Sequence, residues 1–262
     1  MRFRQLDKKR CIAVAGLIGM GVWVCAVAVA QKDPTLGEIL QRLQENLDRY
    51  DSTVPSFFCD EHVESGGAVT NSTILLKRIP RPDDNVILRE SREVKTVNGK
   101  PATADSADGG ILLDGVFSNG LELVSMSQQA CMDYSLKSIN PEHSKDTILV
   151  EFTSVAAGER SPACLMQEDV SGSVLIDPKT MQITRMQFHA PHHIIGTGMG
   201  YLNVTVEYAP VELDGKSFWL PTRISERMAD RRFSWRYDAT YRNYHKMEVT
   251  SRILPLEKTP TP

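Results

Sequence analysis

The chain has 262 residues, of which 41% are hydrophobic and 24% are charged, and its formal net charge is −3 at pH 7. This length supplies one good-sized domain. A protein that binds nucleic acid needs a surplus of basic residues, so the charge balance argues against that class of function and against electrostatic attachment to anionic lipid.

The first thirty residues have the features of a secretory leader. Five basic residues and one acid stand in residues 1–10, and the apolar run Cys11–Ala30 ends in Ala28-Val29-Ala30. A positive start, an apolar centre and small residues at −3 and −1 are typical of a signal peptide. We therefore predict a signal peptide over residues 1–30, whose removal changes the net charge from −3 to −7, and a periplasmic or extracellular product. The alternative is an uncleaved segment that anchors the chain in the inner membrane, since the run is long enough to span a bilayer.

Residues 31–254 are predicted to form one domain that begins with a helix over residues 34–50. Asp33 is placed as the N-cap with Pro34 in the first turn, and Thr35 with Glu38 has the spacing of a capping box. Five apolar residues then fall on one helical face, which we expect to lie on a sheet. They are Leu36, Ile39, Leu40, Leu43 and Leu47.

Several strands are predicted after the helix. Asn98-Gly99 is a strong signal for a hairpin turn, and Pro101–Gly110 has the composition of a loop. A short helix is expected over residues 113–124, and the tail 255–262 is expected to be flexible. The expected strands are Phe57–Glu64, followed by a polar loop, then Ile74–Ile79 and Val86–Val97.

Three cysteines lie outside the leader, which suits one disulfide and one free thiol in an oxidising compartment. If the segments after Cys131 and around Val150 pair as a hairpin, the chain beyond Ser154 returns to the level of Cys131. We therefore favour a Cys131–Cys164 disulfide with Cys59 buried and free; Cys59 with either partner is the alternative.

The plainest pattern lies in residues 172–244, where apolar and polar residues alternate. Alternation puts every second side chain on the same face of a sheet, so one face is apolar and the other is polar. Turn residues such as Asp214-Gly215 separate the strands, and the simplest topology is an antiparallel meander. Arg231, Arg232, Arg236 and Arg242 are expected to cover the outer face.

No catalytic or metal-binding motif stands out. His189, His192 and His193 lack a Cys or an acid at ligand spacing, and we interpret them as part of a hairpin loop next to the Gly196–Gly200 turn. Asp60-Glu61-His62 lies in a predicted strand, where neighbouring side chains point to opposite faces and do not converge. We therefore predict no catalytic residue, cofactor or metal ligand.

The last third carries four strand and turn motifs: Gly172-x-Val174-x-Ile176-Asp177-Pro178-x-Thr180-x-x-Ile183-x-Arg185, Val206-x-Tyr208, Asp214-Gly215-x-x-Phe218-x-Leu220-Pro221 and Tyr241-x-Asn243-Tyr244. These motifs resemble those of the LolA-like superfamily, the periplasmic lipoprotein carriers and their relatives. The resemblance implies a mainly β fold with α: a curved antiparallel half-barrel that is not closed, with an N-terminal helix and one or two short helices against its concave face.

The resulting hypothesis is a secreted, non-enzymatic protein that holds a lipid, a lipoprotein acyl chain or another apolar ligand, with only transient contact with a membrane. The alternative is an interaction or scaffold domain of the cell envelope whose core is filled by its own side chains. The predicted apolar wall consists of Leu202, Val204, Val206, Phe233, Trp235 and Tyr237.

Overall fold

The computed structural model describes residues 34–81, 86–103, 115, 117, 122–124, 126–137, 147–195, 198–230 and 234–247. The predicted leader and the predicted tail lie outside these residues. None of the described helices combines the length and the apolar character needed to cross a membrane.

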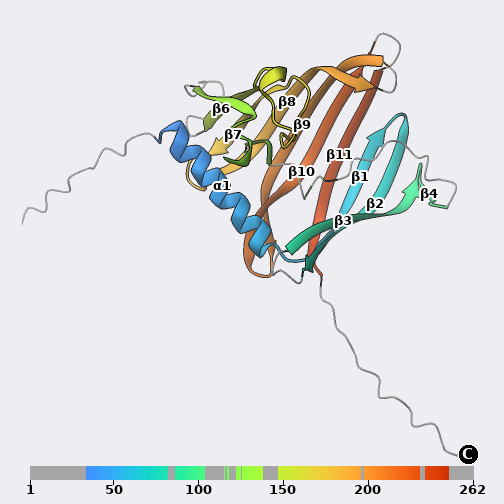
Figure 1. Ribbon diagram of the computed structural model, residues 1–262. Helices are drawn as coiled ribbons and strands as arrows, with labels where there is room; N and C mark the ends of the chain where they lie inside the picture. Colours follow the sequence, from blue (N-terminus) through green and yellow to red (C-terminus); the bar gives the residue numbers. More distant parts are fainter. Residues whose placement is uncertain are drawn as a thin grey trace, which may run out of the picture. The chain divides into compact units, whose positions relative to one another are not determined.

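The domain is built on one antiparallel sheet of eleven strands that does not close into a barrel (Figure 1). The strand order is β4-β3-β2-β1-β11-β10-β9-β8-β7-β6-β5, so consecutive strands pair within β1–β4 and within β5–β11. Strands β4 and β5 form the two edges, and β1 pairs with β11 to join the two runs. This confirms the predicted meander and the unclosed fold. The strands are β1 (Phe57–Ser65), β2 (Ala68–Pro80), β3 (Val86–Val97), β4 (Lys100–Pro101), β5 (Met132–Lys137), β6 (Ile148–Ser154), β7 (Ser171–Asp177), β8 (Gln182–Ile195), β9 (Gly198–Leu213), β10 (Lys216–Ala229) and β11 (Ser234–Lys246).

Alternation along the strands decides which side chains are buried. On β11, Trp235, Tyr237, Ala239 and Tyr241 are buried, and the residues between them are exposed or half-buried. We call the face that carries these buried residues, and against which the helix packs, the inner face. The one-sided pattern expected from a period of two is therefore present.

The helix α1 (Leu36–Thr53) begins at a capping box, in which the Thr35 side chain and Glu38 satisfy each other's backbone N–H groups. Thr35 is the N-cap, so placing Asp33 as the cap and Pro34 in the first turn was wrong; Asp33 itself lies outside the described residues. The capping box prevails because it satisfies two backbone donors at once. The helix also extends three residues beyond the predicted end.

Side-chain hydrogen bonds tie α1 to both sides of the inner face. Near its middle, Asn46 Nδ2 donates to the carbonyl of Met181 at 2.6 Å, next to β8. At its C-terminal end, the Arg78 guanidinium of β2 donates to the carbonyls of Asp51 and Ser52 at 2.6 and 2.7 Å. The helix therefore spans the sheet from β8 to β2 and buries Ile39, Leu40 and Leu43.

Two local predictions need correction. The predicted polar loop after Glu64 is a two-residue turn, because Gly66 and Gly67 both adopt positive φ, at 58° and 81°, and allow β2 to begin at Ala68. Within the predicted short helix, Gly115 and Phe117 are not helical, and the described end is a 3-10 turn, η2 (Glu122–Val124). Two more 3-10 turns are η3 (Met126–Gln128) and η4 (Ala157–Glu159).

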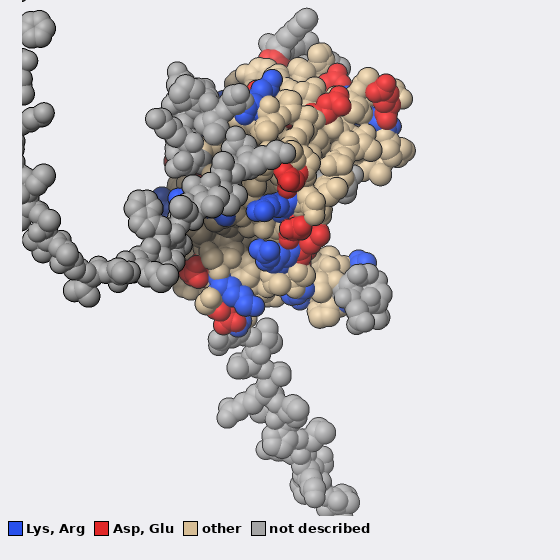
Figure 2. Space-filling view, turned by 90° about the vertical axis from the view of Figure 1, so that its left-hand side faces the viewer, with Lys and Arg blue, Asp and Glu red and all other residues tan. Residues whose placement is uncertain are grey.

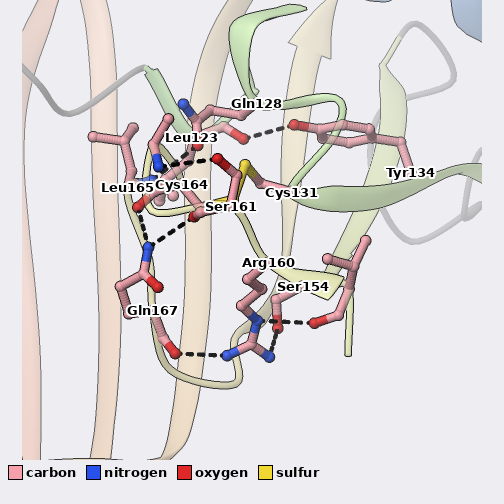
Figure 3. Close-up of a disulfide and its surroundings, with 12 residues drawn as sticks. Leu123, Gln128, Cys131, Tyr134, Ser154, Arg160, Ser161, Cys164, Leu165 and Gln167 are labelled. Carbon is pink, nitrogen blue, oxygen red and sulfur yellow. Dashed lines mark hydrogen bonds between the residues drawn. A yellow bond between two sulfur atoms is a disulfide. The ribbon is translucent and has the colours of Figure 1, made fainter. Parts of the chain in front are cut away.

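The predicted disulfide is confirmed. Strands β5 and β6 pair as a hairpin, and the backbone N–H of Val155 donates to the carbonyl of Cys131 at 3.0 Å. Figure 3 shows the bond between Cys131 and Cys164. Their Cα atoms are 5.6 Å apart, and Cys59 is buried and free.

Candidate functional site

The predicted wall lies on the inner face of the sheet. Leu202, Val204 and Val206 on β9 are 7–9% exposed, while Trp235 and Tyr237 on β11 are 6% and 0% exposed. Phe233 lies outside the described residues. The wall is not continuous, since β10 runs between β9 and β11 and contributes its own inner residues.

One of those β10 residues is a buried acid, Glu226, which the sequence analysis did not single out. Its side chain lies between Tyr237 and Val204 in register and is 7% exposed. Among the described residues, its carboxylate makes no hydrogen bond and no ion pair. Burial raises the pKa of Glu226 to about 7, and the nearby His193 opposes that rise. The sequence did contain a signal that Glu226 is buried: it stands two residues after the buried Ile224, at the next inward-facing position of β10.

The histidine group lies in strand β8, so its interpretation as a hairpin loop was wrong. A register shift between Ala190 and His193, at Pro191, adds a residue to the strand. His193 Nδ1 is 2.8 and 3.0 Å from the two carboxylate oxygens of Glu168, and both side chains are more than two-thirds buried. His189 Nδ1 instead lies 2.8 Å from Asn203 Oδ1. Across the described residues, no group of three potential ligands could hold a metal ion.

The Asp60-Glu61-His62 triplet divides between the two faces as predicted. Asp60 and His62 are exposed, and Asp60 accepts a hydrogen bond from Asn243 Nδ2 at 2.7 Å. Glu61 is 1% exposed on the inner face, where Arg92 Nε donates to it at 2.7 Å. Strand alternation correctly predicted that the three side chains do not converge, but no local pattern indicated this ion pair, since Arg92 is distant in sequence.

Among the residues that the structure describes, Ser65 Oγ, Ser72 Oγ and Tyr208 Oη are also buried without a hydrogen-bond partner. Buried polar groups are usually paired, and each unpaired one costs about 1–3 kcal/mol. The inner face of β1, β2, β9 and β10 therefore carries unsatisfied polar atoms among apolar side chains.

A cavity of about 190 Å³ lies beside α1, mainly between the helix and the ends of β8 and β10. An apolar cavity of about 150 Å³ is large enough to hold benzene or xenon. The predicted wall residues do not line this cavity. Its lining consists of Leu43, Asn46, Leu47, Arg49, Tyr50, Thr53, Val124, Gln182, Ile183, Lys216, Ser217, Phe218 and Trp219.

The outer face carries the charge. Arg236 and Arg242 are exposed as predicted, and Arg236 donates to Asp238 on its own strand; Arg231 and Arg232 lie outside the described residues. Figure 2 shows basic and acidic side chains interspersed on the side that it presents. An interspersed pattern is typical of a solvated surface.

No family model and no curated protein matches the sequence. Among solved structures, a DUF1329 family protein from Desulfovibrio piger is 12% identical with a TM-score of 0.41, and the match covers 81% of this chain and 95% of that one. A Vibrio parahaemolyticus domain described as an outer membrane lipoprotein-sorting protein is 10% identical with a TM-score of 0.42, covering 81% and 93%. MucB is 12% identical with a TM-score of 0.26, covering 80% and 98%. Identities and scores this low show neither a family nor a function for this chain.

Proposed function

We propose that this protein binds a lipid or another apolar ligand on the inner face of its half-barrel, without covalent chemistry. The observation that carries the proposal is the cavity of about 190 Å³ between α1 and the sheet, lined by Leu43, Leu47, Ile183 and Phe218. Ligand sites are usually concave and mostly apolar, with a few polar groups that orient the ligand. Asn46 and Arg49 supply such groups at the helix side of this cavity.

An acyl chain would suit this role energetically. Each buried methylene contributes about 0.8 kcal/mol, so a few buried methylenes suffice for reversible binding. The cavity accommodates part of a chain, and a longer chain would continue over the inner face towards Val204 and Val206.

The second candidate is an interaction domain of the cell envelope without a ligand. The observation that favours it is the close packing of the predicted wall, where Tyr237 is fully buried and Trp235 is 6% exposed. For an interaction domain, the side chains of the inner face form the hydrophobic core, and partner proteins contact the outer face.

The predicted leader and the disulfide support a place outside the cytoplasm for either candidate. Disulfides form and persist in oxidising compartments such as the periplasm. The Cys131–Cys164 bond holds the segment between β6 and β7, in which Gln167 Nε2 donates to the carbonyl of Cys164 at 2.7 Å (Figure 3).

Native mass spectrometry and lipid extraction of the gently purified protein test the proposal. Co-purifying lipid, together with enhanced fluorescence of N-phenyl-1-naphthylamine, is the expected result. Absence of lipid, with no dye uptake by the folded protein, would overturn it and favour the interaction domain.

Two variants locate the ligand. Leu47→Glu places a charge in the cavity beside α1, and Trp235→Glu places one on the predicted wall. We expect both to reduce dye uptake at least about 10-fold, because a buried charge opposes apolar binding. Tyr201→Glu is the control, since Tyr201 on β9 is 42% exposed. Uptake that survives Trp235→Glu would exclude the wall.

A further inference from the structure

The end of the inner face formed by the β1–β2 turn and strands β8 to β11 combines apolar surface with a buried acid. Glu226 on β10 lies directly opposite Tyr237 on β11, and Tyr237 lies opposite Ser65 on β1. Side chains in register on neighbouring strands share one face, about 5 Å apart. Ser65 Oγ, Tyr237 and the Glu226 carboxyl therefore form one polar row across three strands.

Glu226 differs from the other buried acid of this face. Glu61 has its own cation in Arg92, with N–O distances of 2.7 and 3.0 Å. Glu226 is more than nine-tenths buried and makes no hydrogen bond or ion pair with any described residue. A largely buried carboxylate without a protein partner is poorly solvated, so a donor supplied by a ligand would stabilise it.

Near Glu226, acidic side chains outnumber basic ones among the described residues: the acids are Glu226 and Glu168, and the base is His193. His193 on β8 acts on Glu226 when its imidazole is protonated, but its Nδ1 already lies 2.8 Å from a carboxylate oxygen of Glu168. Two carboxyl groups therefore share one imidazole. The neighbouring inner residues Val204 and Met228 are apolar and contribute no charge. The site is complementary to a positively charged group.

Two aromatic rings stand beside the acid. Trp235 and Tyr237 follow each other on the inner face of β11, with ring centroids 5.8 Å apart and planes inclined by 34°. Cations bind favourably within about 6 Å of such ring centroids. Beyond them, Leu202, Val204 and Val206 offer an apolar path along β9.

We propose that this end of the inner face is a site for the ammonium head of an amphiphile, with Glu226 as its counter-ion, Ser65 Oγ as a further acceptor, and the β9 residues against its tail. The proposal rests on the apolar-ligand function given above and adds the chemical class of the head group. A primary amine attached to an alkyl chain satisfies both halves of the site, because its N–H groups supply the donors that Glu226 lacks.

Isothermal titration calorimetry at pH 8 with decylammonium chloride, decanol and sodium decanoate tests the proposal. At this pH an alkylammonium remains charged, as a lysine side chain does, while Glu226, with a pKa of about 7, is mainly ionised. We expect decylammonium to bind at least about 10-fold more tightly than decanol, because a charged hydrogen-bonded pair replaces an unpaired carboxylate.

Glu226→Gln should remove that preference, so that decylammonium and decanol bind with similar affinity. Glu212→Gln is the matched control, because Glu212 is an exposed acid on the neighbouring strand β9 and undergoes the same change of charge. Glu226→Asp, which keeps the charge, should retain part of the preference. Circular dichroism verifies the fold of each variant.

The other outcomes separate the two proposals. Equal binding of decanol and decylammonium, unaffected by Glu226→Gln, would overturn the ammonium site and leave the apolar-ligand function standing. Equal loss of all ligands in Glu226→Gln would also overturn it, since the residue would then be purely structural. If none of the three ligands binds the unmodified protein, both proposals fail.

Discussion

The Arg92 guanidinium on β3 reaches across β2 and holds the Glu61 carboxylate on β1 through two hydrogen bonds, from Nε at 2.7 Å and from Nη2 at 3.0 Å. Ser72, the β2 residue paired with Glu61, has a small side chain that leaves room for this contact. The three N-terminal strands are thereby joined by a side-chain bridge as well as by their backbone ladders.

Arg92→Met should lower the free energy of unfolding by about 3–5 kcal/mol, because it leaves a buried carboxylate without a cation. Urea denaturation measures the loss. Arg89→Met is the control: Arg89 is exposed on the same strand, and its replacement should cost no more than about 0.5 kcal/mol. Similar losses in both variants would contradict a special role for the buried pair.

Loss of the Cys131–Cys164 disulfide should lower the unfolding free energy by about 3–4 kcal/mol. The two cysteines are 33 residues apart in sequence. Without the disulfide, the unfolded chain regains the conformational entropy that a closed loop of this length removes, which gives the expected loss. Chemical denaturation of Cys131→Ala/Cys164→Ala provides the measurement. Treatment with a reductant should destabilise the unmodified protein but not the double variant. Equal destabilisation of both would show that the reductant does not act through this disulfide.

Cys59 should resist alkylation in the folded protein. Burial, followed by the negative charge of Glu61, raises the pKa of its thiol, so the reactive thiolate is scarce. Peptide mass spectrometry after iodoacetamide treatment should find Cys59 unmodified in native buffer and modified in denaturant. Rapid modification of the native protein would show that the β1 strand opens readily.

Gly172→Ala should destabilise the protein by at least about 1–3 kcal/mol, because an added Cβ would lie 2.3 Å from the carbonyl oxygen of Gln187 and 2.4 Å from the Phe152 ring. Phe152 is the residue paired with Gly172 on β6, and its ring occupies the space above the glycine. Thermal denaturation provides the test. Gly37→Ala is the contrasting variant: nothing lies near a Cβ there, so this change in α1 should stabilise by about 0.5–1 kcal/mol.

Glu226 should make the stability of the protein depend on pH. Its pKa is about 7 in the folded state against a reference value of 4.5, so between these values the folded protein keeps a proton that the unfolded chain releases. Stability from this group therefore falls as the pH rises from 4.5 to about 7, by up to about 1.4 kcal/mol per pH unit. The charged groups nearby are His193 and its partner Glu168, and His193 reduces the effect.

Urea denaturation at several pH values, for the unmodified protein and Glu226→Gln, isolates this contribution. The variant should gain stability relative to the unmodified protein as the pH rises, and the gain should level off above pH 7. A constant difference between the two proteins from pH 4.5 to 8 would show that Glu226 does not titrate in this range.

Local patterns in the sequence were enough to predict much of the fold. The alternation along residues 202–208 and 233–241 predicted which side chains face inwards, and for the described residues the structure agrees, because the period of a strand admits only two faces. The strand Val86–Val97 was predicted with its observed bounds, since Asn98-Gly99 ends it sharply. The disulfide followed from hairpin geometry, a contact that is close in sequence.

The tertiary structure decided the polar features of the inner face. Arg92 meets Glu61 because β1, β2 and β3 are neighbours, a relation between residues about thirty positions apart that no local pattern encodes. Glu226 faces Tyr237 because β10 pairs with β11 in one register rather than another, and His193 lies near it because a bulge at Pro191 shifts β8 by one residue. Periodicity assigns a side chain to a face, whereas its neighbours on that face depend on strand order and register, which long-range pairing alone determines.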